Sequence, residues 1–266
     1  MIDSAATRTI AALYRPIEQG RWALRVGGVG FARGYWSGPA LVDIIVLMRD
    51  GENWMSITPL EMESQQIGIE AATGHVVIMG LGMGWAAAAC AMKLEVRAVT
   101  VVERDADVIA MHRELGLFAR LPDGAGGKVR IVEGDALAWR AEESVDLLMP
   151  DIWLPLISDG RIEEVRRMHA NVGARQVYFW GQELEIARHA IVAGRTKLDE
   201  ADISATAEAV GLPLVGPGGK DHASRLRAAA EQWMNDHWLS IERPEPLHAG
   251  AAFQAPPGQL GSAPTL

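Results

Sequence analysis

A continuous stretch, residues 75–105, constrains the fold of this chain more than any other part of the sequence. It reads HVVIMGLGMGWAAAACAMKLEVRAVTVVERD and opens with an apolar, β-branched run that is typical of a buried strand. Three glycines follow at alternate positions: Gly80, Gly82 and Gly84. An alanine-rich segment that favours a helix begins at Trp85, and a second β-branched run, 96–102, ends on Glu103. The order strand, glycine turn, helix and strand predicts a nucleotide-binding α/β unit.

Each part of this unit has a chemical reason. Glycines let the backbone turn sharply and approach a ligand that a Cβ would repel, and the following helix points its free amide groups at the same place. A carboxylate at the end of the second strand, Glu103, can accept both hydroxyl groups of a ribose. The dinucleotide fingerprint requires Gly or Ala where this chain has Trp85, so the pattern disfavours NAD(P). A simple tight turn and a solvated strand-end charge remain the alternatives.

Two later strands also lead into acids. Asp135 and Ala136 follow the third predicted strand, where a carboxylate can accept the amino group of an adenine. Asp135 can also cap a helix over 136–142, and both roles can coexist. Asp151 follows the fourth predicted strand. Because the carboxyl ends of parallel strands meet at one edge of a sheet, we expect these acids to lie near the glycine turn and Glu103.

The rest of the pattern supplies the elements around this edge. Apolar runs predict further strands over 128–132, 145–149 and 176–180. Helical patterns cover 5–15, 59–72, 105–115, 161–170, 183–192, 197–210 and 222–239. Near the N-terminus, 41–48 and 53–57 predict a β-hairpin, whereas the glycine-rich stretch 22–37 shows no clear pattern. The helix after Thr58 carries Glu61 as a capping-box acid, so Glu61 is expected on a solvated capping face.

These elements predict an α/β fold, with a doubly wound, mostly parallel Rossmann-like sheet, a small N-terminal β-hairpin module and C-terminal helices. We expect the hairpin module at 1–58, the cofactor-binding domain at 59–195 and the C-terminal helices at 196–242. Residues 243–266 are rich in Pro, Gly and Ala, which predicts a disordered tail. The apolar hairpin at 41–57 can pair with a second copy, which allows a homodimer.

The composition limits the kinds of partner that the protein can bind and the compartment in which we expect it. The formal net charge is -9 and only four lysines are present, so the chain has no obvious basic surface for nucleic acid. The single cysteine, Cys90, excludes an internal disulfide and leaves no Cys/His zinc pattern, so no metal site is expected. No run is long enough to span a membrane, and the N-terminus lacks the apolar core of a signal peptide. We therefore expect a cytoplasmic protein without a membrane partner.

Over roughly residues 40–180, the order of these pieces resembles the class I S-adenosylmethionine (SAM)-dependent methyltransferases, and among them the spermidine synthase-like branch. VVIMGLGMG resembles the family's glycine motif, VVERD its ribose-binding acid, VEGDA its adenine-contacting segment and VDLLMPDIW the strand that ends in a functional Asp. The resemblance implies SAM as the cofactor. It also implies that Gly80, Gly82 and Gly84 border the amino-acid portion of the cofactor. Glu103 would then hold the ribose, and Asp135 with Ala136 would border the adenine.

The acceptor site departs from the polyamine synthases of this branch. Where the polyamine synthases have Asp-Ser-Ser-Asp-Pro at the end of this strand, the present chain has DIWLP, starting at Asp151. Leu154 therefore replaces the second acid of that motif, and Met83 replaces the acid of the glycine turn. A diamine needs several carboxylates because an unpaired buried charge is costly, so the loss of two acids indicates a more apolar acceptor. The family also places ligand-contacting polar residues on the helix before the first strand, here Glu61, Glu63, Gln65 and Gln66.

We therefore predict methyl transfer from SAM to a small-molecule acceptor. Asp151 is the candidate base or amine-orienting group, and Trp153 is the candidate for stacking on the acceptor or facing the sulfonium. The alternatives are a loop or helix-capping acid and a core tryptophan. Two other functions stay open: polyamine aminopropyl transfer from decarboxylated SAM, and a non-catalytic protein that keeps the fold.

Overall fold

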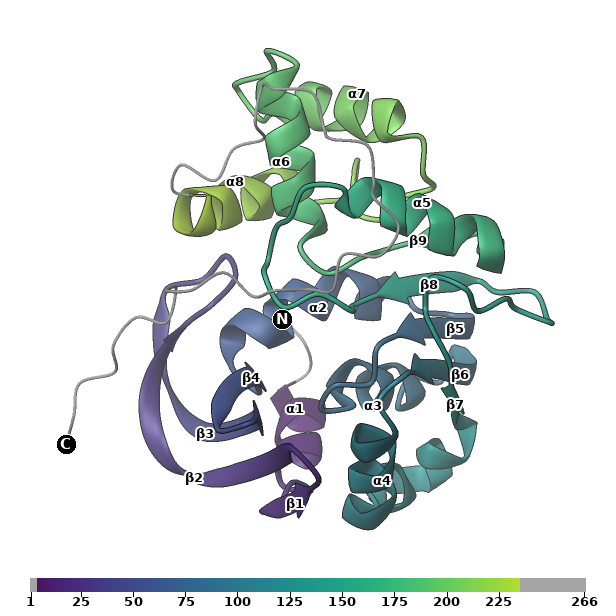
Figure 1. The fold of residues 1–266 in the computed structure, drawn as a ribbon. Coiled ribbons are helices and arrows are strands. Elements are labelled where there is room, and N and C mark those ends of the chain that lie inside the picture. Colours follow the sequence, from purple (N-terminus) through teal and green to yellow (C-terminus); the bar gives the residue numbers. More distant parts are fainter. Residues whose placement is uncertain (1–3, 235–266) are drawn as a thin grey trace.

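The computed structural model describes residues 4–234, which form two β-sheets and the helices that pack against them (Figure 1). A four-stranded antiparallel sheet lies at the N-terminus, and a five-stranded parallel sheet follows it in the chain. This arrangement confirms the predicted α/β fold with a Rossmann-like parallel sheet. The predicted tail at 243–266, and the last part of the helix predicted over 222–239, lie outside the described residues.

The parallel sheet has the strand order β7-β6-β5-β8-β9. Its strands are β5 (Gly74–Met79), β6 (Val96–Glu103), β7 (Val129–Glu133), β8 (Leu147–Pro150) and β9 (Gln176–Val177). All neighbouring strands run parallel, so their carboxyl ends meet at one edge. The direction of winding reverses between β5 and β8, and such a reversal opens a crevice at the strand ends. Pro150 is the last residue of β8, where its missing amide interrupts no interior ladder.

Helices cover both faces of this sheet because alternate residues of β5 point to opposite sides. Val76 and Ile78 pack in one core cluster with α2, α3 and α4, whereas Val77 and Met79 pack in another with α5. A third cluster joins α6, α7 and α8 at the top of Figure 1. The helices are α1 (Ser4–Ala11), α2 (Pro59–Ala71), α3 (Trp85–Ala91), α4 (Ala106–Leu115), η1 (Phe118–Arg120), η2 (Pro122–Lys128), α5 (Arg161–Val172), α6 (Gln182–Val192), α7 (Glu200–Val210) and α8 (His222–Trp233).

The N-terminal sheet is larger than the predicted hairpin. Its strands are β1 (Ile17–Gln19), β2 (Trp22–Arg33), β3 (Pro39–Arg49) and β4 (Glu52–Ser56), in that order. The predicted hairpin is confirmed as β3 and β4, while β2 occupies the stretch without a clear pattern. Its register with β3 shifts between Val26 and Val29, across two glycines, which breaks the alternation that marks a strand. Figure 1 shows β2 and β3 as long curved strands that reach toward α8, where Trp233 Nε1 donates to the carbonyl of Tyr35 at 3.0 Å.

Two local features differ from the sequence pattern. The helix over 136–142 that Asp135 could cap is a single turn, in which the Asp135 carboxylate accepts the amide of Leu137 at 2.9 Å and its carbonyl accepts the amide of Trp139 at 2.8 Å. The capping box at the start of α2 does not form. The Thr58 side chain makes no bond to the helix and instead accepts the hydroxyl of Ser56 at 3.2 Å.

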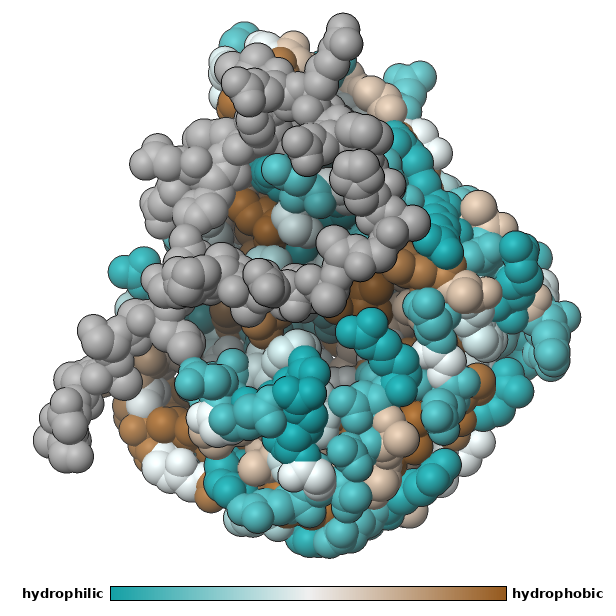
Figure 2. All heavy atoms as spheres, in the orientation of Figure 1, coloured by the Kyte–Doolittle hydropathy of each residue, from teal (hydrophilic) through white to brown (hydrophobic). Residues whose placement is uncertain are grey.

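Exposed apolar side chains gather on β2 and β3: Val26, Val29, Phe31, Leu41 and Ile44. Phe31 is 81% exposed and lies opposite Leu41 in the register of the two strands. Figure 2 shows apolar residues at the left of the molecule, where Figure 1 places these strands. Such patches often mark contact surfaces, and a homodimer through this one stays a prediction. Across residues 4–234, no helix has the length and apolar character needed to cross a membrane.

The packing of α2 against the parallel sheet can be tested at Gly68. A Cβ at this position would lie 2.6 Å from Tyr178 Cδ1 and 2.7 Å from Met149 Cε. We expect Gly68→Ala to lower the free energy of unfolding by about 1–3 kcal/mol, because overpacking outweighs the better helix propensity of alanine. Urea denaturation measures the change. Gly127→Ala is the control, since a Cβ there meets nothing within 4 Å; equal stability of both variants would contradict the packing.

Candidate functional site

A cavity of about 620 Å³ lies at the carboxyl ends of β5, β6, β7 and β8, and residues of the N-terminal sheet form a further wall. The eight residues predicted from the strand-end motifs line it: Gly80, Gly82, Gly84, Glu103, Asp135, Ala136, Asp151 and Trp153. These residues come from four strand ends that are far apart in the sequence. The parallel sheet thus brings these predicted residues together on one surface.

Of the four polar residues singled out on α2, Glu61 and Gln65 line the cavity. Glu63 instead accepts bonds from Trp36 and Ser37, and Gln66 donates to Glu70.

The glycine turn after β5 lies between β8 and the N-terminal sheet. Its φ angles are +101° at Gly80, +47° at Gly82 and +75° at Gly84, in the region that favours glycine. A Cβ on Gly80 would overlap the carbonyl oxygen of Asp151, and one on Gly82 would lie 2.5 Å from Sδ of Met55. The glycines are therefore required both by the backbone conformation and by the close approach of two other segments.

His112 holds this turn from the side of α4. Its Nε2 lies 2.8 Å from the carbonyl oxygen of Gly82, so Nε2 carries the proton and donates it. Burial lowers the pKa of His112 to about 4, which keeps the ring neutral at pH 7. The ring stacks on Phe118 with centroids 5.8 Å apart. No sequence motif marks His112, because its role depends on where α4 packs.

Glu103 links the turn to the end of β6. Its Oε2 accepts the amide of Leu81 at 2.9 Å, and its Oε1 accepts the amide of Asp105 at 2.8 Å. A carboxylate has about four accepting positions, so each oxygen can accept one more hydrogen bond. Glu103 lines the cavity. It is a structural crosslink and also a free acceptor, and these two roles do not compete.

Asp135 lies at the cavity beyond β7. Its Oδ1 accepts the amide of Leu137, as expected for a capping acid, while the residue still lines the cavity beside Ala136. Ala136 is 7% exposed and places a small apolar side chain next to the carboxylate. The capping role and the cavity position coexist at this residue.

Two carboxyl groups meet at the other end of the cavity. Gln65 Nε2 donates to Oδ2 of Asp151 at 2.8 Å. Burial raises the pKa of Asp151 to about 7, against the opposing effect of the Arg161 charge. Burial, and then the charge of Asp151, raise the pKa of Glu61 to about 8, while the amide of Ser56 partly offsets this. Both groups therefore change protonation near neutral pH, as a general acid or base requires.

The expectation of a solvated Glu61 is wrong. Glu61 is half-buried and lines the cavity. As a first-turn residue of α2, Glu61 lies close enough to Asp151 for the two charges to interact, and its carboxyl group accepts the amide of Ser56. The capping-box pattern in the sequence describes local bonding only, so it missed a position set by the packing of α2 on the sheet.

Trp153 is held by neighbouring side chains and also lines the cavity. Its Nε1 donates to Glu164 Oε2 at 2.5 Å, and the Arg161 guanidinium lies 4.5 Å from its ring centroid. Arg161 is 1% exposed and also donates to the carbonyls of Leu156 at 2.5 Å and Pro155 at 2.6 Å. Arg161 thus holds the loop that follows Asp151. In the sequence it is only the first residue of a predicted helix.

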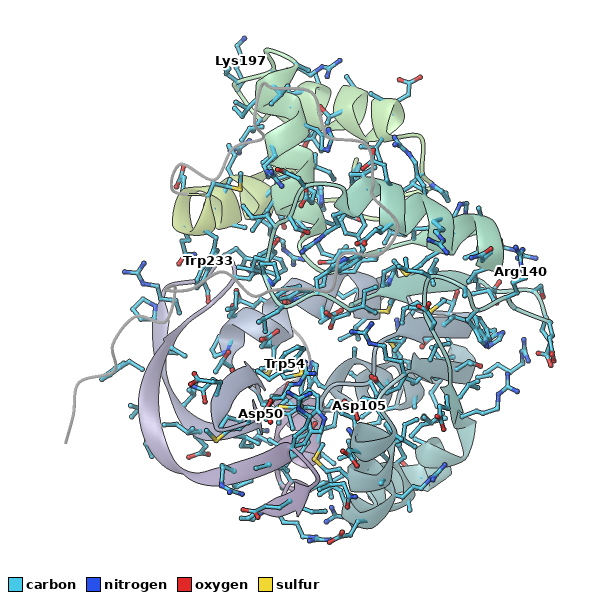
Figure 3. The ribbon with its side chains drawn as sticks, viewed as in Figure 1. Asp50, Trp54, Asp105, Arg140, Lys197 and Trp233 are labelled. Carbon is cyan, nitrogen blue, oxygen red and sulfur yellow. The ribbon has the colours of Figure 1, made fainter. Side chains whose placement is uncertain are left out.

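The N-terminal sheet contributes a wall that the sequence pattern did not reveal. Trp22, Arg49 and Trp54 line the cavity from β2, β3 and β4. Figure 3 labels Trp54 and Asp105 near each other where this sheet faces α4, and Trp22 connects the two: its ring lies 5.3 Å from that of Trp54 and its Nε1 donates to Asp105 at 2.9 Å. This wall could not be predicted from the sequence, because the register in which β2 pairs with β3 could not be predicted.

No protein-family model matches this chain, and no curated protein sequence is significantly similar to it. Similar solved structures include the glycopeptide N-methyltransferase MtfA complexed with SAM, with 19% identity, a TM-score of 0.33 and coverage of 41% of this chain and 42% of that chain. Spermidine synthase from Thermotoga maritima has 16% identity, a TM-score of 0.36 and coverage of 62% and 65%.

The 23S rRNA methyltransferase ErmE has 17% identity, a TM-score of 0.34 and coverage of 48% of each chain. This chain thus spans between 42% and 65% of the lengths of these three proteins. Similarities at this level assign no role to any residue, so the geometry of the cavity remains the basis for a function.

The raised pKa values make stability depend on pH. A carboxyl group whose pKa is higher in the folded than in the unfolded protein stabilises the fold at low pH, and this contribution is lost as pH rises through the folded pKa. For Asp151 that window runs from its ordinary value of 3.8 to about 7. Between pH 5 and 8, we expect the free energy of unfolding of the wild-type protein to fall by roughly 1 kcal/mol or more relative to Asp151→Asn.

Urea denaturation at pH 5, 6, 7 and 8 measures this difference. Asp43→Asn, on the exposed part of β3, is the matched control and should follow the wild-type curve. Parallel curves for the wild-type protein and Asp151→Asn would show that the Asp151 carboxyl is not perturbed.

Proposed function

We propose that this chain is a SAM-dependent methyltransferase that acts on a small-molecule acceptor. The observation that carries the proposal is the convergence of the glycine turn, Glu103, Asp135 and Asp151 on one cavity at the carboxyl ends of parallel strands. SAM consists of an amino-acid portion, a ribose and an adenine. The first needs a backbone that can approach it closely, the second a carboxylate that accepts its hydroxyl groups, and the third a carboxylate that accepts its amino group. The cavity, about 620 Å³, falls within the ordinary range for small-molecule sites.

The residues present fit this cofactor. At Gly80 and Gly82 a Cβ would collide with Asp151 and Met55, so the missing side chains let these two neighbouring segments pack against the turn and enclose the cavity that it lines. The remaining accepting positions of Glu103 suit two ribose hydroxyls. Asp135 Oδ2 makes no hydrogen bond within residues 4–234 and suits the adenine amino group, with the Ala136 methyl beside the ring.

When bound, SAM supplies a methyl group already activated by its sulfonium. The chain then has to orient the acceptor and take its proton. Asp151 is positioned by Gln65 and titrates near neutral pH, so its carboxylate can accept a proton from an acceptor O–H or N–H group. Trp153, two residues further, offers a flat apolar surface for the acceptor. The net charge of -9 favours a small molecule over a nucleic acid as that acceptor.

Aminopropyl transfer from decarboxylated SAM is the second candidate. One observation favours it: Glu61 joins Asp151 and restores a second carboxyl group at the acceptor end of the cavity. Met83 opposes it, because this residue is 1% exposed and places an apolar side chain where the polyamine synthases have an acid. The two functions differ in the cofactor that they require.

Cofactor binding is the first test. We expect SAM and S-adenosylhomocysteine to bind the wild-type protein, and Glu103→Ala to weaken both by about 10-fold or more because charge-assisted bonds to the ribose are lost. Isothermal titration calorimetry measures the dissociation constants. Glu133→Ala is the matched control: Glu133 lies opposite Glu103 in the register of β6 and β7, is exposed, and does not line the cavity.

The other outcomes of this titration are informative. A strong preference for decarboxylated SAM would replace methyl transfer with aminopropyl transfer. If none of these ligands binds the folded wild-type protein, the enzyme proposal fails and only the fold remains. Thermal unfolding of both variants checks that each one is folded.

The role of Asp151 is tested separately. With an acceptor identified by S-adenosylhomocysteine release from a panel of small amines and phenols, we expect Asp151→Asn to lower kcat by about 100-fold or more. The affinity for SAM should stay within about 3-fold, since Asp151 is assigned to the acceptor. Asp43→Asn serves again as the control. Unchanged turnover in Asp151→Asn would remove this residue from the reaction and leave it as a loop acid.

A further inference from the structure

The wall formed by the N-terminal sheet contains an arginine fixed between two tryptophans. Trp22 and Arg49 are direct cross-strand neighbours on β2 and β3. The guanidinium of Arg49 lies 5.4 Å from the ring centroid of Trp22 and 4.9 Å from that of Trp54, and the two rings meet nearly edge to face, at 82°. Trp22 is itself fixed, because its indole N–H donates to Asp105. The guanidinium is therefore held in place by aromatic contacts, at the edge of the cavity.

Arg49 forms no ion pair within residues 4–234, and its only resolved interaction with a carboxylate there is a long-range attraction that contributes last to the lowered pKa of Asp50. Among the described residues, the Nε of Arg49 is buried without a hydrogen-bond partner. Neighbouring acids have other hydrogen-bond partners: Asp50 accepts Arg21 Nε at 3.0 Å and 3.2 Å, and Asp105 accepts the indole. Glu52, opposite Arg49 in the register, is exposed and not paired with it. A desolvated donor without a partner is costly, so this position favours an added acceptor.

We propose that Arg49, with Trp22 and Trp54, forms an anion-binding subsite of the cavity whose ligand is a carboxylate. The planar guanidinium matches a carboxylate with two parallel N–H···O bonds, and the flanking indoles strengthen such bonds by excluding water. Because an arginine on aromatic rings loses little entropy on binding, the subsite is pre-organised. This inference rests on the proposed function only where it names the molecule that carries the carboxylate; the binding of a carboxylate by Arg49 does not depend on that function.

Two sources can supply the carboxylate. The cofactor is one, because SAM carries a carboxylate on its amino-acid portion and decarboxylated SAM does not. Met55, the neighbour of Trp54 on β4, lies against Gly82 of the glycine turn, which places this wall beside that turn. The acceptor is the other source. Glu61 and Asp151 then provide the acidic end of the same cavity and Arg49 its basic end.

The test compares Arg49→Met, which keeps an unbranched apolar side chain between the rings, with Arg49→Lys, which keeps the charge. Arg25→Met is the matched control, since Arg25 is an exposed arginine of the same sheet that pairs with Glu18 outside the cavity. Two sets of ligands are titrated. Calorimetry measures SAM and decarboxylated SAM, and NMR line broadening measures benzoate against neutral benzamide, with and without S-adenosylhomocysteine.

If the cofactor supplies the carboxylate, Arg49→Met weakens SAM by about 10- to 100-fold and leaves decarboxylated SAM within about 3-fold, while Arg49→Lys recovers part of the loss. If the acceptor supplies it, both cofactors bind as before. Benzoate then binds the wild-type protein better than benzamide does, and Arg49→Met removes this preference. Arg25→Met changes none of these values.

The proposal is overturned if Arg49→Met leaves the affinities for SAM and for benzoate unchanged, since the arginine then only stacks on its neighbours. Failure of the proposed function looks different: the wild-type protein binds no SAM at all. In that case the benzoate titration of the free protein still decides the subsite. Benzoate binding that requires Arg49 supports it, and absence of benzoate binding to the wild-type protein overturns it. Thermal unfolding of each variant confirms that the fold persists.

Discussion

The carboxylate of Glu103 is the interaction on which the cavity depends. Through the amides of Leu81 and Asp105 it joins the glycine turn, the end of β6 and the start of α4. Asp105 continues the connection, because it caps α4 and also accepts the indole N–H of Trp22. One line of hydrogen bonds therefore runs from the glycine turn to the N-terminal sheet. A break in this line would leave shielded amides without acceptors, at a cost of about 1–3 kcal/mol each.

The cavity holds charged groups that a protein core normally avoids. At one end burial keeps the carboxyl groups of Glu61 and Asp151 protonated up to near-neutral pH. At another wall, Arg49 is stabilised by aromatic rings in place of a carboxylate. Both arrangements cost stability, and the binding of a ligand or of a proton offsets this cost. Such unbalanced groups are typical of binding and reaction sites.

The parallel sheet and its strand-end residues could be predicted from the sequence because their signals are local. The apolar run before Gly80, the glycines themselves and the acid at Glu103 lie within one stretch, and Asp135 and Asp151 follow recognisable strands. Since parallel strands must place these ends at one edge, the topology followed from the order of the elements.

The remaining features depend on contacts between distant segments. β2 was not recognised because its glycines interrupt the alternation of side chains. Glu61 was expected in a local cap, yet packing turns it to the cavity. Arg161 and Arg49 carry no motif, because the carbonyls and rings that hold them come from other elements. A pattern within one segment contains no information about such partners.

The cavity has walls from two separately encoded parts of the chain. The turn and acids assigned to the cofactor belong to the parallel sheet, whereas Trp22, Arg49 and Trp54 belong to the N-terminal sheet. In evolutionary terms the two parts are coupled through contacts such as the bond from Trp22 to Asp105 and the packing of Met55 against Gly82. Substitutions elsewhere in the first four strands can alter the size, charge and aromatic character of this wall while the strand-end residues of the parallel sheet stay the same. A descendant of this protein can thus acquire a new range of ligands through changes in one stretch of sequence, while the strand ends that form the rest of the cavity are unchanged.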